Sequence, residues 1–256
     1  MIRVIKKKLK SIAENMPLVY EAGYDKGNAE GGDTRELVSQ FTETIQNRAS
    51  GNTGVSYNYA FFQSPFNEKT FADIMSSWDK SKTIIRADFM FSQAQNIGEG
   101  LYTDKLDFSN ARTTREAFSN SGVTKLKVID VRKTEGGFNG MANLFSDCLN
   151  LVSIDEFYPS TATDFVGTFN KCYELKEVIF KSEIAVNGLH LGFSSSLNKE
   201  SLESVVNQLS SNTSGLTVTL PLVAVNNLFD GGRDGTEWQD LIATKPNWTF
   251  AYYERI

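Results

Sequence analysis

The sequence predicts an α/β fold assembled from repeated units, and the spacing of phenylalanine is the observation that predicts it. Intervals of 27, 27, 24 and 24 residues separate five phenylalanines: Phe91, Phe118, Phe145, Phe169 and Phe193. Three positions after each of them stands a small residue: Ala94, Ser121, Cys148, Cys172 and Ser196. A period of about 20–29 residues with a short leucine-rich motif is typical of a leucine-rich-repeat-type solenoid, whose units must stack to bury their apolar sides. We therefore expect such a solenoid, with a short helix and a short strand per repeat, an N-terminal coiled-coil-like helix and capping segments.

Residues 1–32 are expected to form an N-terminal helix and a glycine-rich joint. Six apolar residues follow one another at intervals of 3, 4, 3, 4 and 3 residues: Ile2, Ile5, Leu9, Ile12, Met16 and Val19. This spacing is typical of a coiled-coil seam, and isoleucine in the seam favours three or four strands over two. The alternative is a lone amphipathic helix packed on its own domain, although such helices usually have a wider apolar stripe. We expect these six residues to form an oligomer interface, with a trimer favoured.

Residues 33–87 are expected to form an aromatic-rich N-terminal cap. Asp33 and Glu36 have the spacing of a capping box at the start of a helix. An aromatic, strand-like stretch runs from Val55 to Phe62, and a turn with a short helix continues to Trp78. Terminal repeats of stacked arrays need atypical covers of this kind for solubility. An aromatic binding site is the alternative interpretation of the same residues.

Residues 88–202 are expected to form the repeat array, with a binding surface on its concave side. The segment 162–169 is long enough for two helical turns, and 175–180 is strand-like. Because side chains alternate along a strand, Val178 and Phe180 are expected to face inward. The outward positions of three successive units then form the predicted face: Lys125, Lys127, Ile129, Ser153, Asp155, Phe157, Glu177, Ile179 and Lys181. Extended faces of stacked repeats are their usual binding surfaces.

Residues 203–256 are expected to form a C-terminal cap. A helix is predicted from Leu197 to Leu209, across the end of the array, and a strand from Leu216 to Leu220. The patch 227–235 is rich in turn residues. A helix over 236–243 and a closing strand over 248–253 complete the predicted cap.

The two cysteines stand 24 residues apart at the same repeat position, where other units place alanine or serine. A free cysteine suits such a position because it behaves as a small hydrophobic residue. A disulfide between Cys148 and Cys172 is the alternative, and it requires their Cα atoms to lie within about 7 Å of each other.

Charge and residue content give no support to an enzyme. The net charge of −5 provides no field that attracts nucleic acid or an anionic membrane. Neither a signal peptide nor an apolar run of about 18 residues is visible, so we expect no membrane insertion. His190 is the single histidine, and no local motif supplies a triad or a zinc-ligand spacing. The loop from Asp230 to Asp234 lacks the alternating acidic positions of a calcium loop. We expect no catalytic residue, no metal site and no cofactor.

Two units carry a motif that resembles the BspA-like leucine-rich repeats of bacterial surface proteins: Phe145-x-x-Cys148-x-x-Leu151-x-x-Ile154 and Phe169-x-x-Cys172-x-x-Leu175-x-x-Val178. The layout of the chain also resembles leucine-rich-repeat proteins encoded by phages and prophages, from the basic N-terminal helix to the Trp248-Thr249 strand. Ala94 and Ser121 replace the cysteine in the first two units. The resemblance implies a virion or tail-associated component that binds a host surface or another tail protein, and it supplies no catalytic residues.

Three functions follow as hypotheses. The first is a phage virion protein of the tail or tail tip, made in the host cytoplasm, which forms a homo-oligomer. It would bind other phage tail proteins or a protein or glycan receptor on the host, and no nucleic acid. A bacterial cell-surface adhesion module is the second, and a carbohydrate-active enzyme on a repeat scaffold is the third.

Overall fold

The structure is a computed structural model, and it describes residue 43 and residues 55–64, 66–81, 83–135 and 140–254. The predicted N-terminal helix lies outside these residues, together with its proposed interface residues Ile2, Ile5, Leu9, Ile12, Met16 and Val19. The predicted capping box at Asp33 lies outside them too.

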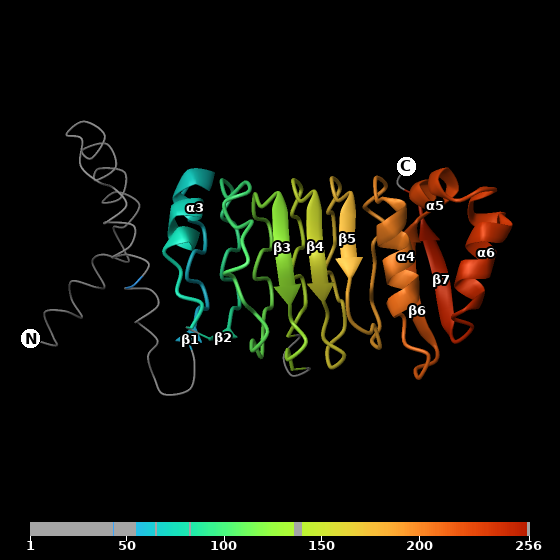
Figure 1. Ribbon diagram of the computed structural model, residues 1–256, viewed down its shortest axis with the longest axis horizontal. Coiled ribbons are helices and arrows are strands. Elements are labelled where there is room, and N and C mark those ends of the chain that lie inside the picture. The colour runs from blue at the N-terminus through green and yellow to red at the C-terminus, as the bar shows by residue number, and fades with distance from the viewer. Residues whose placement is uncertain (1–42, 44–54, 65, 82, 136–139, 255–256) are drawn as a thin grey trace, which may run out of the picture.

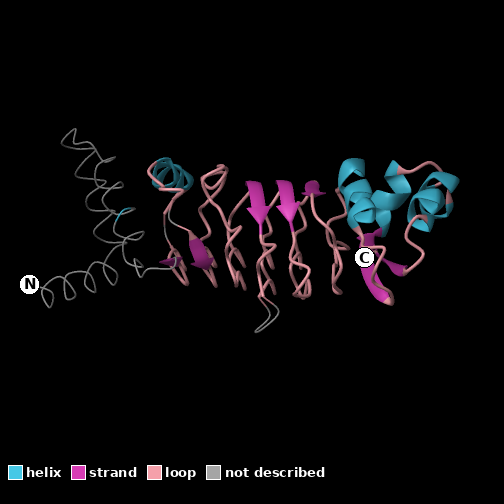
Figure 2. Cartoon of the chain, turned by 60° about the horizontal axis from the view of Figure 1, so that its bottom comes forward, coloured by secondary structure: helices cyan, strands magenta, loops and turns pink. Residues whose placement is uncertain are grey.

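The described chain runs back and forth in a row of similar turns along the long axis of the molecule (Figure 1). We call each of these turns a coil. Helices lie at the two ends of the row, and in Figure 2 those at the C-terminal end gather on one side. The elements are β1 (Val55–Ser56), α3 (Glu68–Ser76), β2 (Ile84–Arg86), β3 (Lys125–Asp130), β4 (Ser153–Tyr158), β5 (Glu177–Phe180), α4 (Lys199–Gln208), β6 (Leu216–Pro221), α5 (Leu222–Leu228), η1 (Gly232–Asp234), α6 (Thr236–Ala243) and β7 (Trp248–Tyr253).

The fold class predicted from the sequence is wrong. The expected solenoid had a short helix and a short strand in every repeat, but no helix lies between β2 and α4 in the described residues. The strands form three separate parallel sheets, with the orders β1-β2, β3-β4-β5 and β6-β7. The described chain is α/β with short parallel sheets.

A pair of linked tight turns occupies the place of each expected helix. We call the segments 57–64, 87–94, 114–121, 141–148 and 165–172 the double turns. Each contains two residues of positive φ four positions apart: Tyr59 and Gln63, Phe89 and Gln93, Glu116 and Asn120, Asn143 and Asp147, and Gly167 and Lys171. A left-handed residue interrupts the i→i−4 hydrogen bonds of an α-helix, so the local sequence cannot continue as one.

Backbone hydrogen bonds between coils hold the double turns in place. The amide of Phe91 donates to the carbonyl of Ala117 in the next coil at 2.7 Å. The amides on either side of it donate within their own turn, from Met90 to Ala87 and from Ser92 to Phe89. The same alternation recurs in the neighbouring coils, and it satisfies the backbone without a helix.

A stack of phenylalanine rings forms the centre of the core. Rings of successive coils lie 5.1–5.5 Å apart at interplanar angles of 1–28°, in the order Phe61, Phe91, Phe118, Phe145 and Phe169. Offset stacking of this kind adds about 0.5–1.5 kcal/mol per pair to the gain from burial.

The fifth predicted anchor, Phe193, does not belong to this stack. The amide of Ser194 donates to the carbonyl of Leu191, just as the amide of Cys172 donates to the carbonyl of Phe169. Ser194 therefore occupies the small-residue position, and the fully buried Leu191 stands three residues before it in the phenylalanine position. Phe193 lies outside the core and is only partly buried.

Both cysteines are free and fully buried. The Cys148 thiol donates to the carbonyl of Phe118 at 2.9 Å. Burial raises the pKa of Cys148 to about 12 and raises that of Cys172 well above its ordinary value. The cysteines fill small core positions as hydrophobic residues.

Serine hydroxyls of helix α4 accept hydrogen bonds from the backbone amides at the free edge of β5. The Ser201 hydroxyl accepts from the amide of Val178 at 2.9 Å, and the Ser204 hydroxyl accepts from Phe180 at 3.2 Å. Asn198 caps the helix by accepting from the Ser201 amide. An edge strand that would otherwise leave unpaired amides is thereby satisfied by side chains.

Candidate functional site

The outward side of β3, β4 and β5 is the candidate site, because it contains most of the predicted binding face. Lys125, Ser153 and Glu177 pair in register across the three strands. All three are partly exposed, as are Asp155 and Ile179, while Lys127 and Lys181 are exposed.

Two residues of the predicted face point the other way. Ile129 and Phe157 are buried, at 1% and 0% exposure, so their assignment to the outward face is wrong. The inward residues Val178 and Phe180 of β5 are separated by one residue, whereas the inward residues of β3 and β4 are separated by two. The pairing of β4 with β5 accordingly shifts register between Ile154 and Phe157. Strict alternation therefore fails in β3 and β4.

Polar side chains of this face are paired across the coils. The Tyr102 hydroxyl donates to Oδ2 of Asp155 at 2.6 Å, and this hydrogen bond raises the pKa of Tyr102. Lys125 Nζ lies 2.7 Å from Oε1 of Glu99, and that contact raises the pKa of Lys125. These interactions link side chains of the face to side chains of neighbouring coils.

Tyr102 is a site residue that the sequence analysis missed. It is 43% exposed, and its partner Asp155 lies 53 residues later in the chain. It follows no repeat spacing, so no pattern in the sequence marks it.

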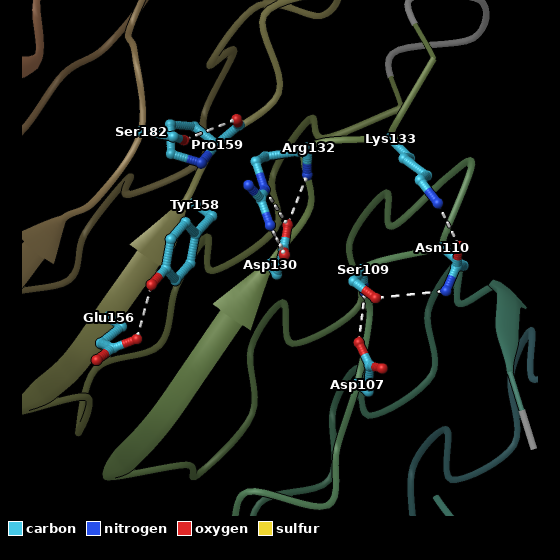
Figure 3. Close-up of polar contacts among 10 residues, drawn as sticks. All are labelled: Asp107, Ser109, Asn110, Asp130, Arg132, Lys133, Glu156, Tyr158, Pro159 and Ser182. Carbon is cyan, nitrogen blue, oxygen red and sulfur yellow. Dashed lines mark hydrogen bonds and ion pairs between the residues drawn. The ribbon is translucent and has the colours of Figure 1, made fainter. Parts of the chain in front are cut away.

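A second polar group lies where β3 and β4 end (Figure 3). Arg132 binds Asp130 with two nitrogens, at 3.0 Å from Nε to Oδ1 and 2.6 Å from Nη2 to Oδ2. Its guanidinium carbon lies 4.9 Å from the ring centre of Tyr158, whose hydroxyl donates to Oε2 of Glu156 at 2.9 Å. These hydrogen bonds raise the pKa values of both Arg132 and Tyr158. The two polar groups together give the strand surface alternating donors, acceptors and charges.

His190 stands among aromatic rings and lies outside this face. Its ring centre lies 5.1 Å from that of Phe193 and 5.6 Å from that of Tyr253. Burial lowers the pKa of His190, and its Nδ1 has no hydrogen-bond partner in the part of the chain that the structure describes.

No group of three or more potential metal ligands occurs within the described ranges. In the loop that superficially resembles a calcium site, the amide of Asp230 donates to Oε2 of Glu237 at 2.9 Å. Lys199 forms an ion pair with the other oxygen of this carboxylate. The Glu237 carboxylate is thus engaged by an amide and an ammonium group.

Comparison with protein-family models, curated proteins and solved structures finds no match for this chain. Among the described helices, none has the length and apolar character needed to cross a membrane.

Proposed function

We propose that this protein is a structural component of a phage virion, associated with the tail or tail tip, which attaches to a receptor or to another tail protein through the outward side of β3, β4 and β5. The proposal takes its biological setting from the resemblance of the two clearest sequence motifs to repeats of phage and bacterial surface proteins. The chain would act as a homo-oligomer, with a trimer favoured by the heptad spacing of its first residues.

The observation that carries the binding role is the arrangement of the outward face. Its polar groups come from successive coils and are held by contacts such as Tyr102 with Asp155, at 2.6 Å. A ligand that meets such a preorganised face immobilises few side chains, so binding costs little conformational entropy. A host-surface protein or glycan has the alternating donors and acceptors that this face would complement.

A cell-binding assay with charge-reversal variants tests the proposal. Fluorescently labelled full-length protein is incubated with the bacterial strain that carries or hosts the gene and with related strains. Asp155→Lys removes the Tyr102 partner and reverses a charge in the face, and we expect it to reduce cell binding at least about tenfold. Asp240→Lys makes the same charge change on the exposed side of α6 and serves as the matched control. Equal binding by both variants would contradict the assignment of the face.

Two measurements test the proposed virion role and the proposed oligomeric state. Mass spectrometry of purified virions should detect the chain, and its absence from them would remove the virion role in favour of a cell-surface adhesion protein. Light scattering of the full-length protein at micromolar concentration should give the mass of a trimer, and a monomer mass would remove the oligomer.

A further inference from the structure

β7 is the last strand of the row, and it has a strand partner on one side only among the described residues. Its sheet consists of β6 and β7, and β6 also contacts the preceding coil through a bridge from His190 to Thr219. β6 therefore lies between that coil and β7. All six residues of β7 pair with β6 without a register shift, so the pairing is continuous over the whole strand. Figure 1 shows it at the C-terminal end of the row, next to α6.

The printed hydrogen bonds identify which backbone groups of β7 face outward. Thr219 donates to Leu189 and accepts from Leu191, so both of its backbone groups point to the preceding coil. Backbone direction alternates along a parallel strand, so Val218 and Leu220 point toward β7. Their register partners are Phe250 and Tyr252, which bond to neither of them directly. The odd-numbered residues of β7 bond to β6, and the amides and carbonyls of Phe250 and Tyr252 point away from it.

The strand itself carries none of the sequence features that usually protect a free edge. Natural edge strands are shielded by charged residues, proline, a bulge or a short length, or by a helix or loop that covers the edge. β7 reads Trp-Thr-Phe-Ala-Tyr-Tyr over six residues, with no charge and no proline, and its pairing has no bulge. Aromatic and β-branched residues also favour an extended conformation. Such a strand is a template for another strand.

We propose that the outer edge of β7 accepts one extended strand from another protein. The added strand would carry apolar side chains at alternate positions. On one side of β7, Phe250 and Tyr252 contact Trp238 of α6, and the Arg233 guanidinium carbon lies 5.5 Å from the ring centre of Tyr252. Side chains added on that side would meet these aromatic rings, which favours apolar residues. The other side carries Thr249 and Ala251, where small or polar residues fit. This surface is separate from the outward face of β3–β5 and goes beyond the attachment role.

The position of α6 favours a single strand over the edge of a second copy of this chain. In both Figure 1 and Figure 2, α6 lies at the outer end of the row, beyond β7. A second copy paired through β7 would bring its own α4 and α6 to the same place, whereas a lone strand carries no helices. Addition of one peptide strand to a sheet edge is a recurring mode of protein recognition.

Amide hydrogen exchange on the free full-length protein tests whether the edge is open. Thr249 and Ala251 donate toward β6, and their exchange should be slow. Phe250 and Tyr252 should exchange at least about tenfold faster, because their amides have no strand partner. Slow exchange at all four residues would mean that the edge is already covered, and it would overturn the proposal.

A peptide-binding assay tests the docking itself. The probe is a fluorescent peptide with the sequence of residues 216–221, Leu-Thr-Val-Thr-Leu-Pro, which already pairs with β7 on its inner side. We expect saturable binding to the full-length protein by fluorescence anisotropy, and none for the same peptide N-methylated at alternate amides. Absence of saturable binding, or equal binding of the methylated peptide, would overturn the proposal.

Two substitutions at Tyr252 distinguish the contribution of the backbone amide to peptide binding from that of the side chain. Tyr252→Pro removes the outward amide, which an edge strand tolerates because that amide has no partner in the sheet. Tyr252→Ala removes the same side chain and keeps the amide. We expect the proline variant to bind the probe at least about tenfold more weakly than the alanine variant. Equal affinities, with both variants folded by circular dichroism, would refute the assignment of the edge.

Discussion

Replacement of Phe145 tests the ring stack that organises the core. Phe145 is fully buried, and its ring centre lies 5.4 Å from that of Phe118 and 5.5 Å from that of Phe169. The ring centre of Phe157 lies 6.1 Å away in an edge-to-face arrangement. Phe145→Ala removes the ring and leaves a cavity, and such changes cost about 3–5 kcal/mol of unfolding free energy. Phe145→Leu keeps most of the volume but loses the ring contacts, so we expect a loss of about 1–2 kcal/mol.

Urea unfolding followed by far-ultraviolet circular dichroism measures both losses, provided that the slope of the unfolding free energy against urea concentration is the same in the variants. Phe193→Ala is the decisive comparison, because the spacing in the sequence places Phe193 in the stack while the structure places Leu191 there. The structure predicts a loss of about 1 kcal/mol for Phe193→Ala, since the ring is only partly buried. A loss as large as that of Phe145→Ala would refute the ring order described here.

Three further predictions concern packing, thiol reactivity and pH. A Cβ at Gly122 would lie 1.7 Å from the backbone oxygen of Gln95, so Gly122→Ala should cost about 2–3 kcal/mol in urea unfolding, and an unchanged midpoint would contradict the close approach. Because burial raises the pKa of Cys148 to about 12, its thiol should not react with Ellman's reagent until urea unfolds the protein, and rapid labelling of the native state would contradict that burial. The hydrogen bond from Lys171 lowers the pKa of Asp147, so this pair stabilises the fold above the ordinary carboxyl pKa of about 3.9, and the stabilisation is lost as the pH falls through the lowered value. Lys171→Met should therefore lower the unfolding free energy by about 0.2–1 kcal/mol at pH 7 and by less at pH 2, and an equal difference at both pH values would contradict the assignment.

The sequence predicts the core of the row better than its backbone. Four of the five spaced phenylalanines do stack, because an apolar ring at a fixed interval is visible in the chain itself. The prediction for Phe193 is wrong because the last repeat is only 22 residues long, from Phe169 to Leu191, and Leu191 occupies the position of the ring. At the other end of the stack, Phe61 packs against Phe91. The sequence analysis missed Phe61 because it lies 30 residues before Phe91, outside the spacing of 24–27 residues between the other rings.

Local preference predicts the backbone of the double turns only in part. Asn143 and Gly167 belong to residue types that favour positive φ, but Glu116 and Lys171 have positive φ although neither residue type favours that conformation. Their geometry is held by hydrogen bonds to coils that lie more than 20 residues away, such as Glu116 to Ala142 at 3.0 Å. Interactions of that range leave no periodic pattern in the sequence.

The candidate site was predicted in part for the same reason. Lys125, Ser153 and Glu177 follow the unit spacing and do share a row on the strand surface. Ile129 and Phe157 were misplaced because an additional residue in β3 and β4 changes which side chains face inward. Tyr102 joins the site through a contact across the coils that no spacing reveals.

The backbone hydrogen bonds between the double turns all run in one direction, since the amides of each double turn donate to carbonyls of the next one. Elsewhere in the coils, amides donate to the preceding coil as well, as Val152 does to Thr124. The double turns therefore give the row a direction along its long axis. Intervals between the stacked rings vary from 24 to 30 residues, so length changes are absorbed in the connections and leave the double turns intact. Evolution can lengthen a connection freely, but it can add or remove a coil only as a whole unit and in the same orientation.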